Sequence, residues 1–209
     1  MGKMKLYYWT GYRSVRCIWL IKELGVEEDF EFVKLKPNGP DKKALEDYAK
    51  NVHPHGTIPA LQVEGRNPVV ESGAICLFLA NKYGRFGPDD DHVSDYYNWI
   101  VYTTSTLDAT LAVLFSRWYL NSSVYDDATV EKTLDKWKAS LDFLTKALAD
   151  GRDFICGSKF TAADCVLGYS LAWAEFIKQQ NLFAHHPVVV NYLKRLYSRS
   201  AFQEALKYE

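Results

Sequence analysis

HGTIPALQVEGRNPVVES (residues 55–72) holds two short apolar runs on either side of EGRN, and this pattern predicts a β-hairpin with Gly65 in its turn. Pro59 stands at the start of the first run. A proline has no N–H to give to a sheet, so it is tolerated at the first residue of a strand, at an edge or at a bulge. Two interpretations follow. Either a trans Pro59 opens a strand at Ala60, or a cis Ile58–Pro59 bond leaves the main chain of Ile58 unpaired for a ligand.

The sequence around this hairpin alternates between strand and helix patterns. Gly25 and Gly84 stand where the C-caps of two helices are expected. The order βαβαββα predicts a mixed sheet with helices packed on it. The expected elements are strands at Lys5–Trp9, 29–35, 59–63 and 68–70 and helices at Ser14–Leu24, 41–51 and Ser72–Tyr83.

Beyond a linker marked by Gly84, Gly87 and Pro88, the patterns are helical only. Thr161 and Asp164 form a predicted capping box, Ser200 and Gln203 a second one. Pro187 suits the first position of a further helix. The clearest helix carries one sustained apolar stripe, which we interpret as core: Val130, Leu134, Trp137, Leu141, Leu144 and Leu148.

Composition restricts the function classes. The 209 residues are 48% hydrophobic with a formal net charge of −1, which is typical of a globular protein and lacks the basic footprint of a nucleic-acid-binding protein. The chain shows neither a secretory signal pattern nor a run approaching the ~18 apolar residues of a membrane span. The four cysteines form no C-x-x-C pair and no metal-ligand spacing. We therefore expect no metal, no membrane, no nucleic acid and a reducing compartment.

Glu71 and Ser72 stand together at the start of the helix that follows the hairpin. A helix N-terminus has free N–H groups and a partial positive charge, which suit a carboxylate. Ser72 adds a hydroxyl donor, and Glu71 adds an anion that can hold an ammonium group. The pair therefore suits an α-amino acid. The alternative is that Ser72 only caps the helix and Glu71 is a first-turn acid.

The whole chain resembles the cytosolic glutathione transferase family. The family's glutathione-site signature, T-I-P-A-L followed by E-S, is present as Thr57–Leu61 and Glu71-Ser72. GSKFTAADC (157–165) resembles the folding motif of the family's helical domain, and WLIKELG (19–25) resembles its first helix. The resemblance implies the glutathione transferase fold: a thioredoxin-like α/β domain at 1–84, a linker at 85–92 and an all-α domain at 93–209.

The resemblance also implies that glutathione is the co-substrate, and it gives each matching residue a role. Pro59 would be the cis-proline of the family, and Ile58 would pair its main chain with the cysteinyl unit. Glu71 and Ser72 would hold the γ-glutamyl end. Thr57 falls where many members carry a lysine that helps bind the glycyl end.

Conjugation requires glutathione as the thiolate, because the thiol is a poor nucleophile. In the family, the activating donor is a serine, tyrosine or cysteine at or after the end of the first strand. LYYWTGYRSVR (6–16) offers three hydroxyls. Tyr12 falls in the slot of the theta-like serine, Ser14 lies at the helix start, and Tyr8 matches the strand tyrosine of alpha-, mu- and pi-like members. We rank them in that order. No cysteine fills the slot, which disfavours disulfide-exchange chemistry.

The resemblance implies a second site for a small hydrophobic electrophile between the domains. The candidates for one wall, with core packing as the alternative, are Tyr96, Trp99, Tyr102 and Thr103. The implied activity is conjugation of glutathione, with peroxide reduction as a further activity, in a cytoplasmic homodimer that serves detoxification. The alternative is a glutathione-transferase-like interaction module with little catalysis.

Overall fold

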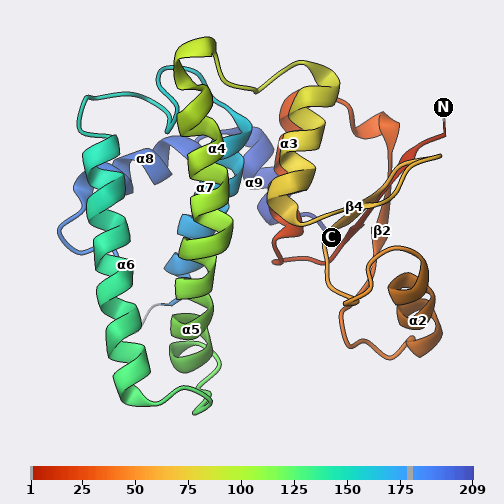
Figure 1. Cartoon of the computed structure of the whole chain (residues 1–209), viewed down its shortest axis with the longest axis horizontal. Helices are drawn as coiled ribbons and strands as arrows, with labels where there is room; N and C mark the ends of the chain where they lie inside the picture. The colour runs from red at the N-terminus through yellow and green to blue at the C-terminus, as the bar shows by residue number, and fades with distance from the viewer. Residues whose placement is uncertain (1, 178–180) are drawn as a thin grey trace. The chain divides into compact units, whose positions relative to one another are not determined.

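The computed structural model describes residues 2–177 and 181–209. Contacts within the chain divide it into two compact units (Figure 1). The first contains Met1–Arg85 together with Arg199–Glu209, and the second contains Phe86–Ser198.

The first unit is built on a four-stranded mixed sheet of order β2-β1-β3-β4. Strand β1 runs parallel to β2 and antiparallel to β3, which pairs antiparallel with β4. The predicted order βαβαββα is confirmed, with strand ends within a few residues of those expected. The elements are β1 (Met4–Tyr8), α1 (Ser14–Leu24), η1 (Glu27–Asp29), β2 (Phe30–Lys34), α2 (Lys42–Asn51), β3 (Ala60–Gln62), β4 (Val69–Val70), α3 (Ser72–Tyr83) and α9 (Ser200–Leu206).

Helices cover both faces of this sheet. Successive side chains of a strand point to opposite faces, so each face has its own side chains to pack against a helix. Leu6 is fully buried, whereas the neighbouring Tyr7 packs its ring 4.8 Å from that of Tyr48 in α2. Figure 1 shows α2 and α3 on opposite sides of the strands. Helices α1 and α3 pack against each other. Both end in a left-handed glycine, Gly25 (φ 68°) and Gly84 (φ 63°), as expected.

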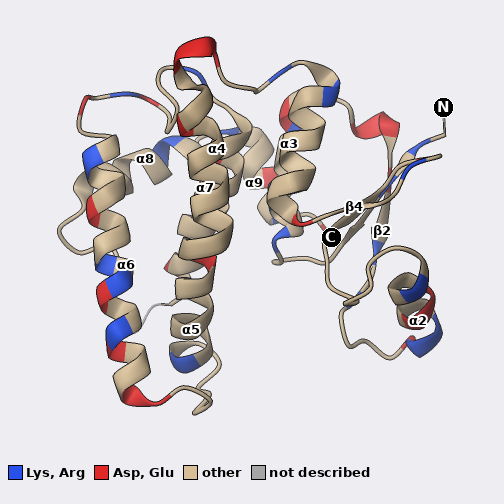
Figure 2. Ribbon diagram, in the orientation of Figure 1, with Lys and Arg blue, Asp and Glu red and all other residues tan. Residues whose placement is uncertain are grey.

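The second unit is helical, as predicted. Its long helix α6 buries the expected apolar stripe, except that Leu134 is half-buried, and charged residues follow its outer surface in Figure 2. A π-helical turn, η3, joins α4 to α5. The elements are η2 (Asp90–His92), α4 (Val93–Tyr102), η3 (Thr103–Leu107), α5 (Asp108–Trp118), α6 (Asp127–Ala147), α7 (Ala162–Glu175) and α8 (Pro187–Tyr197).

The predicted helix starts have different outcomes. The capping box at the start of α7 is confirmed, because Thr161 and Asp164 make both of its reciprocal hydrogen bonds. Pro187 is the first residue of α8, also as predicted. The second capping box is wrong. Ser200 is already helical, and Arg199 occupies the N-cap position without a side-chain cap bond.

The last residues differ from the expected domain division, which placed 93–209 in one helical domain. Arg199–Glu209 belongs to the first unit. The reason is side-chain packing on α1: the rings of Trp19 and Phe202 stack with centroids 3.8 Å apart, and Arg199 Nε donates to Glu23 over 2.6 Å. All four cysteines are buried, and none forms a disulfide within the described residues. None of the helices in the described part of the chain combines the length and apolar character of a membrane span.

Candidate functional site

Strand β3 begins directly after Pro59, and the residue before the proline lies outside the sheet. Ala60 pairs with Val70 of β4, and the Ile58–Pro59 peptide bond is cis, as the second interpretation of this segment predicted. Within the described residues, neither the N–H nor the C=O of Ile58 has a hydrogen-bond partner. Main-chain groups of a largely buried residue are normally paired. These two groups are therefore available to a ligand with an extended backbone.

A small hydrogen-bond network supports this segment from α2. The Tyr48 hydroxyl donates to the Thr57 carbonyl oxygen over 2.6 Å, and a 2.9 Å hydrogen bond joins the Thr57 hydroxyl to His53 Nε2. Burial raises the pKa of Tyr48 above its usual range, so this phenol stays a neutral donor. The side chain of Thr57 is thus engaged with His53. Sequence analysis did not identify Tyr48 and His53, because nothing in the sequence shows that their side chains hydrogen-bond to Thr57 across loop 52–59.

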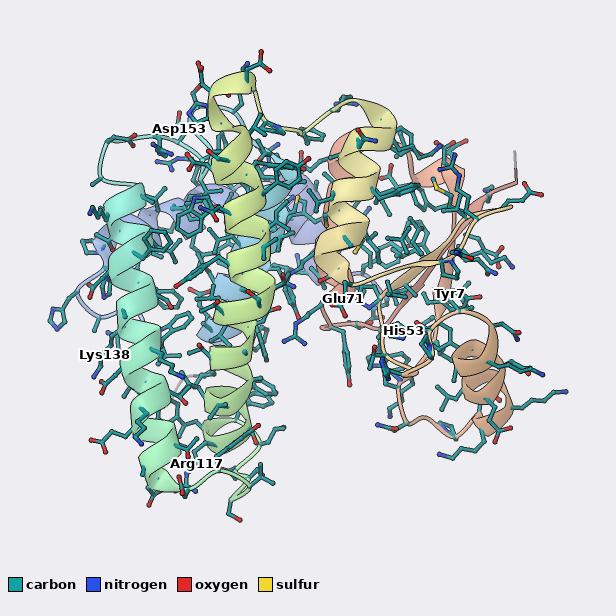
Figure 3. The ribbon with its side chains drawn as sticks, in the orientation of Figure 1. Tyr7, His53, Glu71, Arg117, Lys138 and Asp153 are labelled. Atoms are coloured by element: carbon teal, nitrogen blue, oxygen red, sulfur yellow. The ribbon has the colours of Figure 1, made fainter. Side chains whose placement is uncertain are left out.

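The start of α3 presents a second set of ligand-binding groups. Glu71 is exposed with φ +70°, a strained conformation for a non-glycine residue that costs about 1–3 kcal/mol and is concentrated at functional sites. Ser72 is the first residue of the helix and is 3% exposed. Figure 3 labels Glu71 at this helix start, with Tyr7 on β1 and His53 after α2.

Arg16 of α1 polarises the Ser72 hydroxyl. Its Nη1 donates to Ser72 Oγ over 3.0 Å, so Ser72 accepts from Arg16 and keeps its own proton for a different acceptor. No acceptor for that proton is found among residues 2–177 and 181–209. The Arg16 side chain is fully buried, and a buried cation beside a helix N-terminus favours an anion there. Sequence reasoning did not assign Arg16 to the site, although a lone arginine in the apolar run SVRCIWL is a signal for it.

Ser14, the second-ranked thiol activator, is used locally. Its hydroxyl donates to the Trp9 carbonyl oxygen over 2.9 Å and accepts from the Trp9 N–H over 3.4 Å. The side chain is fully buried. Ser14 therefore closes the turn between β1 and α1, and its hydroxyl proton is already donated to the Trp9 carbonyl oxygen.

The two tyrosine candidates differ in exposure. Tyr8 is 4% exposed, and its ring packs against those of Phe32 and Tyr208. Burial, with the neighbouring Tyr208 phenol, raises the pKa of Tyr8, which weakens it as a donor to a thiolate. Tyr12 is 45% exposed in the turn before α1. Of the three hydroxyls, only that of Tyr12 is both exposed and uncommitted within the described residues.

The four residues expected to line a second-substrate site lie in two different environments. Trp99 and Tyr102 line a cavity of about 430 Å³ inside the second unit, bounded by α4, α6 and residues 150–152, and Phe143 of α6 stacks on Trp99 at 4.8 Å. Tyr96 and Thr103 are buried and do not line this cavity. The Thr103 hydroxyl is buried without a partner in the described part of the chain.

The polar end of this cavity holds a paired carboxylate. Arg152 donates to both carboxylate oxygens of Asp150, at 2.7 to 3.0 Å, and these hydrogen bonds lower the pKa of Asp150 to about 2. Because this pKa is depressed by folding, the pair's contribution to stability is present above the unfolded-state pKa and is lost as the pH falls toward 2. We expect an NMR titration of Asp150 to show a midpoint near 2, and Arg152→Ala to return it to about 3.9. Equal midpoints in both proteins would contradict the pairing.

Comparisons with known proteins show the family to which the chain belongs. The family described as "Glutathione S-transferase, N-terminal domain" matches residues 2–81, and "Glutathione S-transferase, C-terminal domain" matches 127–195. Glutathione S-transferase GstA of Escherichia coli O157:H7 is 30% identical over 217 aligned positions, which cover 99% of this chain and 98% of that protein. The chain belongs to the glutathione transferase family.

Solved structures of family members have the same fold. A glutathione transferase from Methylococcus capsulatus superposes with a TM-score of 0.82 at 25% identity, covering 98% of this chain and 97% of the other. A sphingomonad glutathione S-transferase in complex with glutathione superposes with a TM-score of 0.80 at 26% identity, covering 97% of each chain. The predicted thioredoxin-like unit followed by an all-α unit is confirmed. Among the described residues, no three His, Cys, Asp or Glu side chains are arranged to hold a metal ion.

Proposed function

We propose that the protein binds glutathione at Ile58, Glu71 and Ser72 and transfers its sulfur to a small hydrophobic electrophile. The observation that carries the proposal is the pair of unpartnered main-chain groups at Ile58, in the same unit as the Ser72 hydroxyl. A cysteinyl residue offers the complementary C=O and N–H. Family membership and the sphingomonad relative solved with glutathione support this assignment.

Each end of the tripeptide has a chemical partner in this proposal. The γ-glutamyl carboxylate accepts hydrogen bonds from the Ser72 hydroxyl and the first free N–H groups of α3, next to the buried Arg16. The exposed Glu71 carboxylate pairs with the ammonium group. Ile58 holds the cysteinyl unit in the middle, which directs the thiol away from the charged end.

The reaction needs the thiol to ionise at neutral pH. A free thiol has a pKa near ~8.5, so its anion must be favoured by about 2–3 kcal/mol, at ~1.36 kcal/mol per pKa unit. We assign this role to the Tyr12 hydroxyl, which donates to the sulfur. The thiolate then attacks the electrophilic carbon, a C–S bond forms, and the leaving group departs with its bonding electrons. With a peroxide instead, two glutathione molecules yield the disulfide, an alcohol and water.

Binding and turnover together test the proposal. Calorimetric titration with glutathione measures binding, and release of halide from an activated aryl chloride measures turnover. Binding with turnover is the expected result. Binding without turnover on aryl chlorides or peroxides would favour an interaction module with little catalysis, and the absence of binding would overturn the glutathione site.

The homodimer and the cytoplasmic location expected from the resemblance are part of the same proposal. Light scattering coupled to size-exclusion chromatography tests the dimer, and cell fractionation tests the location. A monomer at micromolar concentration would contradict the homodimer. Recovery in the membrane or secreted fraction would contradict the cytoplasmic location.

Replacing Ser72 by alanine is expected to weaken glutathione binding about 10- to 100-fold, because a hydrogen bond to a charged group contributes about 1.5–3 kcal/mol. Calorimetry on the folded variant measures the change. Ser200→Ala is the matched control, since Ser200 also opens a helix but makes no side-chain cap bond. Equal affinities in Ser72→Ala and the parent would remove Ser72 from the site.

A further inference from the structure

The C-terminal helix is anchored to α1 by three separate contacts. Phe202 stacks on Trp19, Arg199 donates to both carboxylate oxygens of Glu23 at 2.6 and 2.7 Å, and Lys22 Nζ lies 2.8 Å from Glu204 Oε2. Phe202 and Trp19 are fully buried, so this helix is part of the core of the first unit.

Tyr208, just beyond this helix, reaches the turn between β1 and α1. Its carbonyl oxygen accepts a 3.1 Å hydrogen bond from the Thr10 hydroxyl. Its ring packs against Tyr8 and Phe32, with centroids 5.3 and 5.1 Å away, and Lys22 Nζ lies 5.6 Å from the ring centroid. The tail therefore contacts both the end of β1 and the turn that follows it.

That turn, residues 9–13, carries Tyr12, whose N–H donates to the Trp9 carbonyl oxygen over 3.2 Å. Gly11 and Tyr12 are exposed and the other residues of the turn are half-buried, and Gly11 has φ +73°. Ser14 closes the turn at Trp9, and the tail holds it at Thr10. Tyr12 lies between these two attachment points, so both restrict where its side chain can go.

We propose that Tyr208 is a positioning residue for thiol activation: its main-chain carbonyl and its ring hold the turn 9–13 so that the Tyr12 hydroxyl meets the glutathione sulfur. The inference rests on the proposed function. A hydroxyl lowers the pKa of a thiol only while it is held within hydrogen-bond distance of the sulfur. Preorganised donors stabilise developing charge because they need not reorient during the reaction. Loosening the turn therefore weakens activation without removing the activator.

Two variants test this role, one at the hydrogen-bond donor and one at its acceptor. Thr10→Val removes the donor and keeps the side-chain shape, whereas truncation after Lys207 removes the acceptor and the ring. Each is expected to raise the pKa of bound glutathione, read from thiolate absorbance, and to lower kcat/KM below neutral pH about fivefold, the effect of losing one hydrogen bond. The plateau of kcat/KM at high pH and the glutathione affinity should stay near parental values. The double variant should be no worse than the truncation alone, because both remove the same contact.

Glu204→Gln is the matched control, because it breaks the exposed pair with Lys22 but leaves Thr10 and Tyr208 in place. It should keep the parental pH profile. If the parent lowers the pKa of the bound thiol and both variants lower it equally, this inference is wrong and the proposed function is unaffected. An equal loss of rate at every pH, with a lower melting temperature, would also overturn it and leave Tyr208 as a packing residue. A parent that does not lower the thiol pKa would overturn the proposed function and this inference with it.

Discussion

Replacing Asp164 by alanine is expected to lower the free energy of unfolding by about 3–5 kcal/mol. The carboxylate is fully buried and accepts from the Ile155 N–H over 2.9 Å, the Thr161 N–H over 2.8 Å and the Tyr192 hydroxyl over 2.8 Å. The Thr161 hydroxyl also donates to this carboxylate over 3.0 Å, so alanine would leave four buried donors without their acceptor, and each unsatisfied donor costs about 1–3 kcal/mol. Urea denaturation of the parent and the variant measures the difference.

Asp135→Ala is the control for this substitution. Asp135 is a surface residue of the second unit with an ion pair to Lys138 at 3.1 Å, so its loss should change stability by less than about 0.5 kcal/mol. Folded Asp164→Ala protein should bind glutathione with parental affinity. A stable variant that has lost glutathione binding would show that Asp164 belongs to the ligand site instead of the helix start.

Tyr12→Phe is expected to lower kcat/KM at neutral pH roughly 10²- to 10³-fold, as the loss of one charge-stabilising donor does in other enzymes. The pKa of bound glutathione should rise toward the ~8.5 of a free thiol. Glutathione affinity should change little, because the hydroxyl acts on the sulfur and the peptide is held elsewhere. Thiolate absorbance titrated against pH, beside steady-state rates, measures both effects.

Tyr119→Phe is the matched control for Tyr12→Phe. Tyr119 is 51% exposed, close to the 45% of Tyr12, and belongs to the second unit. Its removal should leave the titration unchanged. An unchanged titration in Tyr12→Phe together with a shift in Ser14→Ala would transfer the role to Ser14, which would then have to give up its hydrogen bond to Trp9.

The elements that sequence reasoning placed correctly are those set by local chemistry. Gly25 and Gly84 end their helices because a residue without Cβ adopts the left-handed conformation at little cost. Thr161 and Asp164 are three residues apart, so their reciprocal hydrogen bonds form within one turn. The hairpin follows from EGRN, with Gly65 at φ +70°. Each of these signals lies within a few residues of the structure it specifies.

The features that sequence reasoning missed depend on contacts between distant residues. Phe202 stacks on Trp19 from the other end of the chain, and nothing near Ser200 indicates that α9 joins the first unit. The second capping box is wrong because α9 begins at Ser200 itself, so Arg199 and not the serine holds the N-cap position. Tyr96 and Thr103 were grouped with Trp99 and Tyr102 by the resemblance, which does not show which of the four side chains border the cavity in the second unit.

In the candidate site, too, residues marked by a local sequence pattern were predicted, and residues placed by distant contacts were not. Ile58, Glu71 and Ser72 were identified from a short motif and a helix start. Arg16 was not, because its role depends on α1 and α3 packing side by side, which brings its guanidinium to Ser72. The Ser14 hydroxyl looked free in the sequence, and only the folded turn shows it bonded to Trp9.

Backbone NMR during a glutathione titration tests the glutathione site most directly. The amide signals of Ile58, Ser72 and Gly73 should shift together and saturate at the affinity that calorimetry gives, since their N–H groups lie at the middle and at the γ-glutamyl end of the proposed site. Amides of α6 in the second unit should stay unchanged. Saturable shifts confined to other residues, or no shift at millimolar glutathione, would contradict the assignment of this site.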